Sequence, residues 1–172
     1  TPLTLAETAS VFGEMMTFRT LLAESNVETK KYLLASKIED MINTVIRQIS
    51  FFEFEKLLHN ERKKGELSSD QICEFWMKTQ SESLGPHIEL TEGYKYFWTY
   101  IPHFIHTPFY VYAYAFGDCL VNILIQLYDE GLPNFKNNYI DLLKSGGSKH
   151  YSEVLKPFNV DLKNKDSWQK GL

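Results

Sequence analysis

The sequence has only two cysteines, Cys73 and Cys119, among its 172 residues. They form no C-x-x-C pair and lack the dense spacing of a disulfide-stabilised fold or a thiolate zinc site. No basic segment followed by an apolar run and a small-residue cleavage site resembles a signal peptide. We therefore expect reduced thiols and a cytoplasmic protein.

Positive charge is also scarce, because 18 Lys and Arg residues face 22 Asp and Glu residues and give a formal net charge of −4. Without a basic excess to neutralise phosphates, nucleic acid is not an expected partner. Residues 108–128 are about long enough to span a bilayer. However, Asp118, Asn122 and Gln126 recur every four residues along one side of the expected helix. We therefore expect a buried helix of a soluble protein and no membrane partner.

Strand patterns are almost absent, whereas apolar residues recur at helical spacing throughout the chain. Hydrophobic residues make up 44% and aromatic residues 15% of the sequence, enough for a packed core. We see no repeat, low-complexity segment or linker. The sequence thus predicts an all-α protein in which residues 1–172 form a single helical region.

The first half of the chain predicts two helices. A helix over 4–24 would contain Gly13, which we expect to mark close packing against a neighbour. The absence of proline and glycine from 28–64 predicts one long helix ending before Gly65. The residues expected on the buried sides are Leu5, Phe12, Met15, Met16, Phe18, Leu21 and Leu22, then Ile38, Met41, Ile42, Val45, Ile46, Ile49, Phe52 and Leu57.

Capping patterns place the later helices. The S-x-x-Q sequence at 68–71 has the form of a capping box and predicts a helix that stops before Leu84-Gly85-Pro86. Thr107 as N-cap with Pro108 at the first helical position predicts the start of the next helix, which Gly131 and Pro133 would end. Two shorter helices are expected to follow, one ending at 145–147 and one before Pro157.

The stretch PHFIHTPFYVYAYAFGDCL, residues 102–120, concentrates groups that can carry chemistry. On a helix Tyr110 and Tyr114 share one side, and Tyr112 points roughly the other way. His103 precedes the helix, so imidazole and phenol converge at a loop-helix junction, where enzymes place donors for an oxyanion. From periodicity alone, a core helix with ordinarily hydrogen-bonded tyrosines and histidines is favoured over a reaction site.

Further motifs are few. The sequence has no H-E-x-x-H, no G-x-S-x-G and no glycine-rich phosphate loop. Glu7, within LAETAS, stands in the first turn of a helix, where a carboxylate is favoured electrostatically. It could also bind zinc, but two further protein ligands would be needed.

Three segments together carry a family resemblance: PLTLAETASVFGE, SESLGP and IPHFIHTPFYVYAYAFGDCLVN. They resemble the C-terminal part of the oligoendopeptidase F family, relatives of thimet oligopeptidase. The resemblance implies a largely helical zinc metalloendopeptidase that cuts short peptides in a deep channel. It also implies one zinc ion as cofactor and oligopeptides as substrates.

The resemblance assigns roles to individual residues. Glu7 matches the third zinc ligand of the family. His103 and Tyr110 match the residues that bind substrate and stabilise the tetrahedral intermediate. Tyr112 and Tyr114 belong to the same motif and are further catalytic candidates, and His106 is a weaker candidate for substrate binding.

The chain departs from the family because the H-E-x-x-H helix, with two zinc-binding histidines and the general base, precedes AETAS there, whereas this chain starts at Thr1. We therefore expect a C-terminal fragment that acts with the N-terminal remainder of the same polypeptide. Alone, it is expected to hydrolyse nothing and to hold no zinc tightly. Two alternatives stay open: a non-catalytic helical binding or scaffold protein, and a hydrolase that uses a serine or a cysteine.

Overall fold

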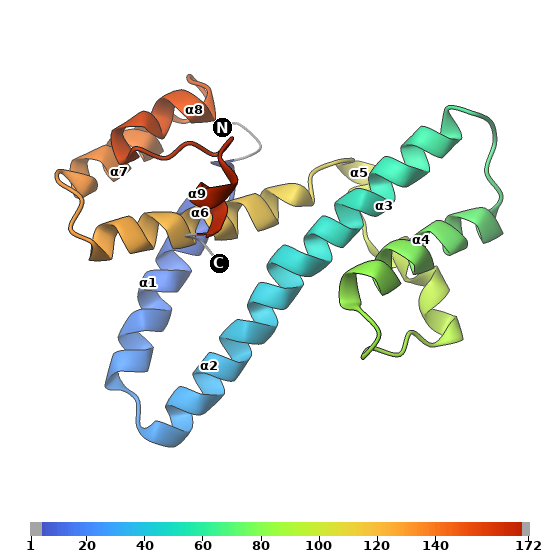
Figure 1. The fold of residues 1–172 in the computed structure, drawn as a ribbon, viewed down its shortest axis with the longest axis horizontal. Helices are drawn as coiled ribbons and strands as arrows, with labels where there is room; N and C mark the ends of the chain where they lie inside the picture. The colour runs from blue at the N-terminus through green and yellow to red at the C-terminus, as the bar shows by residue number, and fades with distance from the viewer. Residues whose placement is uncertain (1–4, 170–172) are drawn as a thin grey trace. The chain divides into compact units, whose positions relative to one another are not determined.

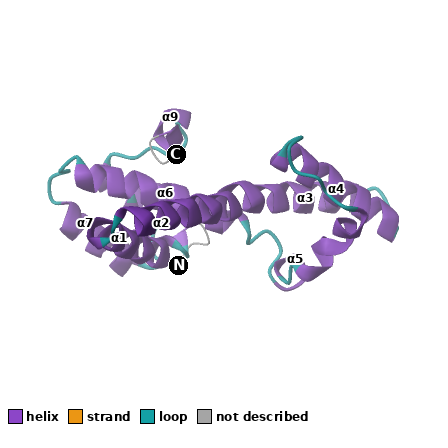
Figure 2. Ribbon diagram, turned by 90° about the horizontal axis from the view of Figure 1, so that it is seen from below, coloured by secondary structure: helices purple, strands orange, loops and turns teal. Residues whose placement is uncertain are grey.

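A computed structural model describes residues 5–169, and their regular secondary structure is entirely helical (Figures 1 and 2). The all-α prediction is thus confirmed. No helix among these residues is long and apolar enough to cross a membrane. The elements are α1 (Thr8–Glu24), α2 (Val27–Met41), η2 (Ile42–Ile46), α3 (Arg47–Arg62), α4 (Ser69–Leu84), η3 (Glu92–Tyr100), α5 (His103–His106), α6 (Tyr112–Asp129), α7 (Phe135–Ser145), α8 (Tyr151–Val154), η4 (Lys156–Phe158) and α9 (Lys165–Gln169).

The chain folds into two compact units. Among the described residues, 5–39 together with 116–169 form the first unit, and Asp40–Ala115 form the second. Both boundaries fall inside helices, α2 and α6, instead of in a linker. Composition therefore gives no sign of the division.

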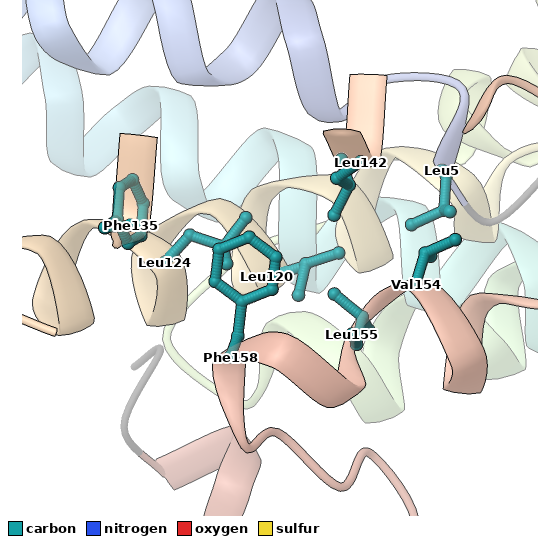
Figure 3. Packing of buried hydrophobic residues seen from close by; sticks show 8 residues of the cluster. All are labelled: Leu5, Leu120, Leu124, Phe135, Leu142, Val154, Leu155 and Phe158. Carbon is teal, nitrogen blue, oxygen red and sulfur yellow. The ribbon is translucent and has the colours of Figure 1, made fainter. Parts of the chain in front are cut away.

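The first unit has an aliphatic core built on α6. Its Leu120 and Leu124 are fully buried and face side chains from the C-terminal helices (Figure 3). Phe12 of α1 packs against this core, with its ring centroid 4.3 Å from that of Tyr139. The buried members are Leu5, Leu120, Leu124, Phe135, Leu142, Val154, Leu155 and Phe158.

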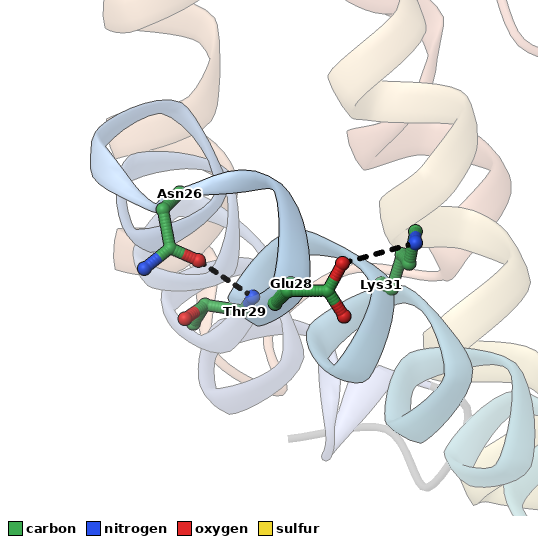
Figure 4. A network of polar contacts seen from close by, with 4 residues as sticks. All are labelled: Asn26, Glu28, Thr29 and Lys31. Carbon is green, nitrogen blue, oxygen red and sulfur yellow. Dashed lines mark hydrogen bonds and ion pairs between the residues drawn. The ribbon is translucent and has the colours of Figure 1, made fainter.

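A short turn joins α1 to α2. The Asn26 side chain accepts a hydrogen bond from the Thr29 backbone N–H at 3.0 Å, which satisfies one amide of the first turn of α2 (Figure 4). One turn in, Glu28 pairs with Lys31 at 3.1 Å. Local chemistry thus starts α2 at Val27, one residue before the predicted position.

The predicted long helix is confirmed, since α2, η2 and α3 follow one another without a break (Figure 1). A π-helical turn, η2, interrupts it, and the sequence predicts no such turn. Part of the predicted buried stripe is wrong, because periodicity shows which face is apolar but not whether a neighbour covers it. The predicted core residues that are exposed are Leu21, Ile38, Ile42, Ile46 and Ile49.

The second unit has an aromatic core between α3 and α4. Trp76 is completely buried, and its ring centroid lies 5.3 Å from those of Phe51 and Phe54. The predicted capping box that starts α4 is present, with Ser68 and Gln71 each accepting from the other's backbone N–H. The helix ends at Leu84, one residue beyond the predicted end, and is followed by Gly85, whose φ of 76° suits glycine.

A buried chain of polar groups links α3, α4 and η3 in the same unit. Gln80 donates to the Ser50 hydroxyl at 2.6 Å, and Ser50 donates to the Thr79 carbonyl at 3.1 Å. The Tyr94 hydroxyl donates to the Gln80 carbonyl oxygen at 3.2 Å. Because buried polar groups are costly unless they are paired, this chain fixes the three elements in one arrangement.

The start of α6 differs from the prediction. The helix begins at Tyr112, four residues after Pro108, and Thr107 instead ends α5. Phe109 has a φ of 61°, which an α-helix does not allow. The predicted ends are confirmed: Gly131, with a φ of 75°, follows α6, and α7 ends at Ser145.

Candidate active site

His103 and Tyr114 form the centre of the predicted site, within the second unit. The Nε2 atom of His103 lies 3.0 Å from the Tyr114 hydroxyl oxygen, a hydrogen-bonding distance, and the two rings are perpendicular. Both side chains are half-buried. The predicted convergence of imidazole and phenol at the junction before α6 is therefore present.

Tyr110 joins this pair. Its ring stacks on His103, with centroids 5.8 Å apart, and lies edge-on to Tyr114 at 5.3 Å. Tyr112 is directed elsewhere, against Phe52 at 5.4 Å, as expected from its position two residues away from each of the others. His106 is exposed at the end of α5. We call His103, Tyr110 and Tyr114 the His-Tyr cluster.

Phe104 anchors the short helix α5 that carries His103. Its ring lies 5.2 Å from Phe54 and 5.7 Å from Phe51, so it is part of the aromatic core. The neighbouring His103 points out of that core toward the tyrosines. A helix of four residues has little stability of its own, so this packing is what holds the imidazole in place.

Glu55 anchors the loop that carries Tyr110. This glutamate is 1% exposed, and its Oε1 atom accepts a hydrogen bond from the Phe109 backbone N–H at 2.8 Å. Its Oε2 atom has no hydrogen-bond partner among the described residues, and burial raises the pKa of its carboxyl group. Glu55 is not among the predicted site residues, although a signal is present: a glutamate four residues after Phe51 falls on the buried side of α3.

Glu7, the predicted zinc ligand, lies in the first unit, directly before α1. Its backbone carbonyl accepts hydrogen bonds from Val11 at 3.1 Å and Ser10 at 3.0 Å. Gly117 of α6 packs against it so closely that a β-carbon at position 117 would stand 2.9 Å from the β-carbon of Glu7. The close packing predicted at Gly13 is wrong, since Gly13 faces open space. The glycine that is closely packed is Gly117.

The described residues do not complete a metal site. No group of three His, Cys, Asp or Glu side chains in 5–169 is arranged to hold an ion. A catalytic zinc site requires three protein ligands, and Glu7 would supply one. The part of the chain seen here therefore does not by itself fit a zinc ion.

Comparison with known proteins places the chain in a family. The model of peptidase family M3 matches residues 1–172. The chain belongs to this family. The predicted likeness to the oligoendopeptidase F group is confirmed as well.

Among relatives of this M3 chain, the oligoendopeptidase F homolog of Borreliella burgdorferi is 35% identical over 162 residues, which are 93% of this chain and 27% of that protein. Oligopeptidase PepF of Bacillus subtilis is 34% identical over 163 residues, which are 92% of this chain and 24% of that protein. The M3 chain thus spans about a quarter of the length of these curated relatives.

Solved structures agree with this assignment. The crystal structure of oligoendopeptidase-F from Enterococcus faecium matches with a TM-score of 0.84 at 29% identity, covering 98% of this chain and 32% of that one. A putative peptidase from Chlamydophila abortus matches with a TM-score of 0.84 at 30% identity, covering 99% of this chain and 29% of that one. The helical fold described here is therefore that of a segment of these larger proteins.

Proposed function

We propose that this chain is the C-terminal part of a zinc-dependent metalloendopeptidase that hydrolyses short peptides in the cytoplasm. The observation that carries the proposal is the match of the M3 family model along residues 1–172. The N-terminal remainder of the polypeptide would supply the H-E-x-x-H motif, which this sequence lacks. The chain covers only about a quarter of the length of its relatives, and this supports the existence of such a remainder.

In this proposal the His-Tyr cluster binds the peptide and stabilises the oxyanion formed at the scissile carbonyl. The Tyr114 hydroxyl and His103 already lie 3.0 Å apart, so both are held near one point before substrate arrives. Tyr110, stacked on His103, is the further donor. The contact of Tyr112 with Phe52 supports a packing role, and the exposed His106 is a candidate contact for an outer part of the substrate.

Glu7 is proposed as one zinc ligand, with the two histidines of the missing motif as the others. The close approach of Gly117 supports this assignment, because it holds the Glu7 backbone in a fixed position. When bound, a catalytic zinc lowers the pKa of its water and polarises a carbonyl. Residues 1–172 alone would bind zinc weakly and hydrolyse nothing.

The test uses the full-length protein and a quenched fluorescent oligopeptide. Tyr114→Phe should lower kcat by about 10²–10³ with KM little changed, since an oxyanion donor acts in the transition state. Tyr112→Phe is the matched control, because it removes a hydroxyl from the same motif and should leave kcat within about twofold. Equal losses in both variants, or no hydrolysis by the unmodified protein, would contradict the proposal.

Zinc content provides a second measurement. The full-length protein should contain one zinc ion by elemental analysis, and Glu7→Gln should lower that content, because the amide is a weaker ligand. Glu14→Gln, on an exposed side chain of α1, is the control. Stoichiometric zinc in residues 1–172 alone would overturn the prediction that this part lacks a complete site.

The two alternatives make different predictions. A cysteine hydrolase requires an accessible thiolate, whereas Cys73 and Cys119 are both buried and burial raises the pKa of Cys119 to about 11. A serine hydrolase would be labelled by a fluorophosphonate probe and would resist chelators. A non-catalytic binding protein would bind peptides without hydrolysing them even at full length.

A further inference from the structure

A cavity of about 360 Å³ lies in the second unit beside the His-Tyr cluster. His103 and Tyr114 contribute to its wall. Further wall comes from the π-helical turn η2 and the start of α3, through Thr44, Arg47 and Gln48. These three residues stand at positions i, i+3 and i+4, so they share one side of the helix.

Arg47 is the cation of this cavity. Its guanidinium group lies over the Phe51 ring, 5.2 Å from the centroid, so the rigid aromatic core supports it. Its charge and the hydrogen bond that it makes with the Tyr94 side chain hold the pKa of Tyr94 below the value that burial alone would produce. Tyr94 is therefore a neutral partner of Arg47, not a carboxylate. The side chain is half-buried, as suits a group that is held at a wall instead of extending into water.

No Asp or Glu within 5–169 forms an ion pair with Arg47. The ion pairs recorded in that range use other cations, namely Arg19, Lys31, Lys37, Lys56, Lys64 and Lys95. Removing a charge from water is costly unless an opposite charge or hydrogen bonds compensate, and the chain as a whole carries an excess of acids that could have supplied a partner. An arginine left without a carboxylate on the wall of a cavity is therefore suited to a ligand that brings its own.

The neighbouring donors fit the same ligand. A planar guanidinium group binds a carboxylate through two parallel hydrogen bonds, and the Gln48 amide and Thr44 hydroxyl can donate from the same side. The π-helical turn directly before Arg47 is a further indication of a binding site, since such turns occur often at functional sites.

We propose that Arg47, assisted by Gln48 and Thr44, binds a carboxylate of the peptide substrate in the cavity beside His103 and Tyr114. This proposal rests on the proposed peptidase function and adds a preference for one chemical group. The carboxylate is either the C-terminus of the peptide or an acidic side chain.

The experiment measures equilibrium binding to the full-length protein by fluorescence anisotropy, with EDTA present so that no peptide is hydrolysed. Three labelled heptapeptides of Gly, Ala and Phe serve as probes. The first has a free C-terminal carboxylate, the second a C-terminal amide, and the third a C-terminal amide with one internal Asp. Either acidic peptide should bind about tenfold to hundredfold more tightly than the neutral one, as expected for a hydrogen-bonded charge pair. Which of them does so identifies the source of the carboxylate.

The variants locate the effect. Arg47→Met keeps the length of the side chain and should abolish the difference between acidic and neutral peptides, whereas Arg47→Lys should retain part of it. Arg62→Met, at the exposed end of the same helix, should leave it unchanged. Melting temperatures within a few degrees of the parent would show that the variants are folded.

The outcomes separate this proposal from the proposed function. Equal binding of all three peptides by a protein that hydrolyses them would overturn the carboxylate site and leave the peptidase standing. A difference that persists in Arg47→Met would also overturn it. If none of the peptides binds, the carboxylate site is overturned, and the peptidase proposal is decided separately by the hydrolysis assay.

Discussion

The cores of the two units differ in the side chains that fill them. The first unit packs mostly leucine, with Val154, Phe135 and Phe158, around Leu120 and Leu124, and many residues share the burial. The second unit relies on Phe51, Phe54 and Trp76, a few large rings that each contact several others. The His-Tyr cluster stands on this second core through Phe104. The comparison indicates that the position of the His-Tyr cluster depends on few large side chains, whereas the core of the first unit is distributed over more and smaller ones.

The strongest test of this comparison is to remove one member from each core. Trp76→Ala should lower the free energy of unfolding by about 3–5 kcal/mol, and Leu120→Ala by about 2–5 kcal/mol. Hydrogen exchange followed by mass spectrometry should show the loss of protection mainly in 40–115 for Trp76→Ala and mainly in 116–169 for Leu120→Ala. Tyr100→Ala, at an exposed aromatic residue, should change stability by less than about 0.5 kcal/mol. Equal loss of protection across both units in each variant would show that they unfold together.

Two glycines of opposite environment sharpen the comparison within the first unit. Gly117→Ala should cost about 1–3 kcal/mol, because the new methyl group meets the β-carbon of Glu7. Gly13→Ala should instead stabilise by about 0.5–1 kcal/mol, because it adds helix propensity in open space. Denaturant titration of both variants measures whether each substitution raises or lowers the free energy of unfolding. Stabilisation by both would mean that Glu7 yields easily, and that its position is not fixed by packing.

Among the described residues each unit buries one carboxylate, Asp118 in the first and Glu55 in the second, and their responses to pH should differ. Burial raises the pKa of Glu55 above its ordinary value of 4.5, so the folded state holds this proton more tightly than the unfolded state does. Stability from this group should therefore fall as pH rises from 4.5 through the raised value, and Glu55→Gln should remove that slope. Burial also raises the pKa of Asp118, but the positive charge of Lys37, whose Nζ lies 3.9 Å from the Asp118 carboxylate, opposes this rise.

The measurement is the free energy of unfolding between pH 4 and pH 8, with Glu53→Gln on the exposed side of α3 as control. We expect Asp118→Asn to flatten the curve less than Glu55→Gln does. A slope that is the same in the parent and in Glu55→Gln would show that the buried carboxyl group does not titrate in this range.

The smallest effect is expected at the surface. Arg19 and Asp129 form an ion pair of 2.8 Å in the first unit, with side chains 38% and 47% exposed. A double-mutant cycle with alanine at both positions should give a coupling of about 0–1 kcal/mol, and salt should weaken it. A coupling above 2 kcal/mol would show that this surface pair, and not only the core, contributes substantially to the stability of the first unit.

Much of the fold follows from local chemistry. The capping box at Ser68, the glycines at 85 and 131 and the uninterrupted run 28–64 predict helix ends because the groups that determine them lie within a few residues. The start of α6 could not be predicted in this way, because Glu55, 54 positions from Phe109, holds the loop that delays it. The apolar stripe wrongly predicts burial of the exposed isoleucines of η2 and α3 for a similar reason: the sequence shows which face of a helix is apolar but not whether a neighbour covers it.

The same distinction applies to the site. The spacing of Tyr110 and Tyr114 and the position of His103 predict their convergence, since all three lie within twelve residues. The contact between Glu7 and Gly117 joins distant parts of the chain, so the sequence cannot show which glycine is packed. Arg47 has no local signal either, because its significance lies in the absence of a paired carboxylate among the described residues.

The contacts that hold Phe109, in the loop before α6, have a consequence for sequence evolution. Phe52, Glu55 and His59 all reach Phe109, the first and last through ring contacts of 6.1 and 4.8 Å and Glu55 through the backbone amide. Substitutions at position 55 that lose the acceptor should therefore be accompanied in related sequences by glycine or asparagine at position 109, where a positive φ then costs less. Such paired changes would let an alignment identify the loop geometry in relatives for which no structure exists.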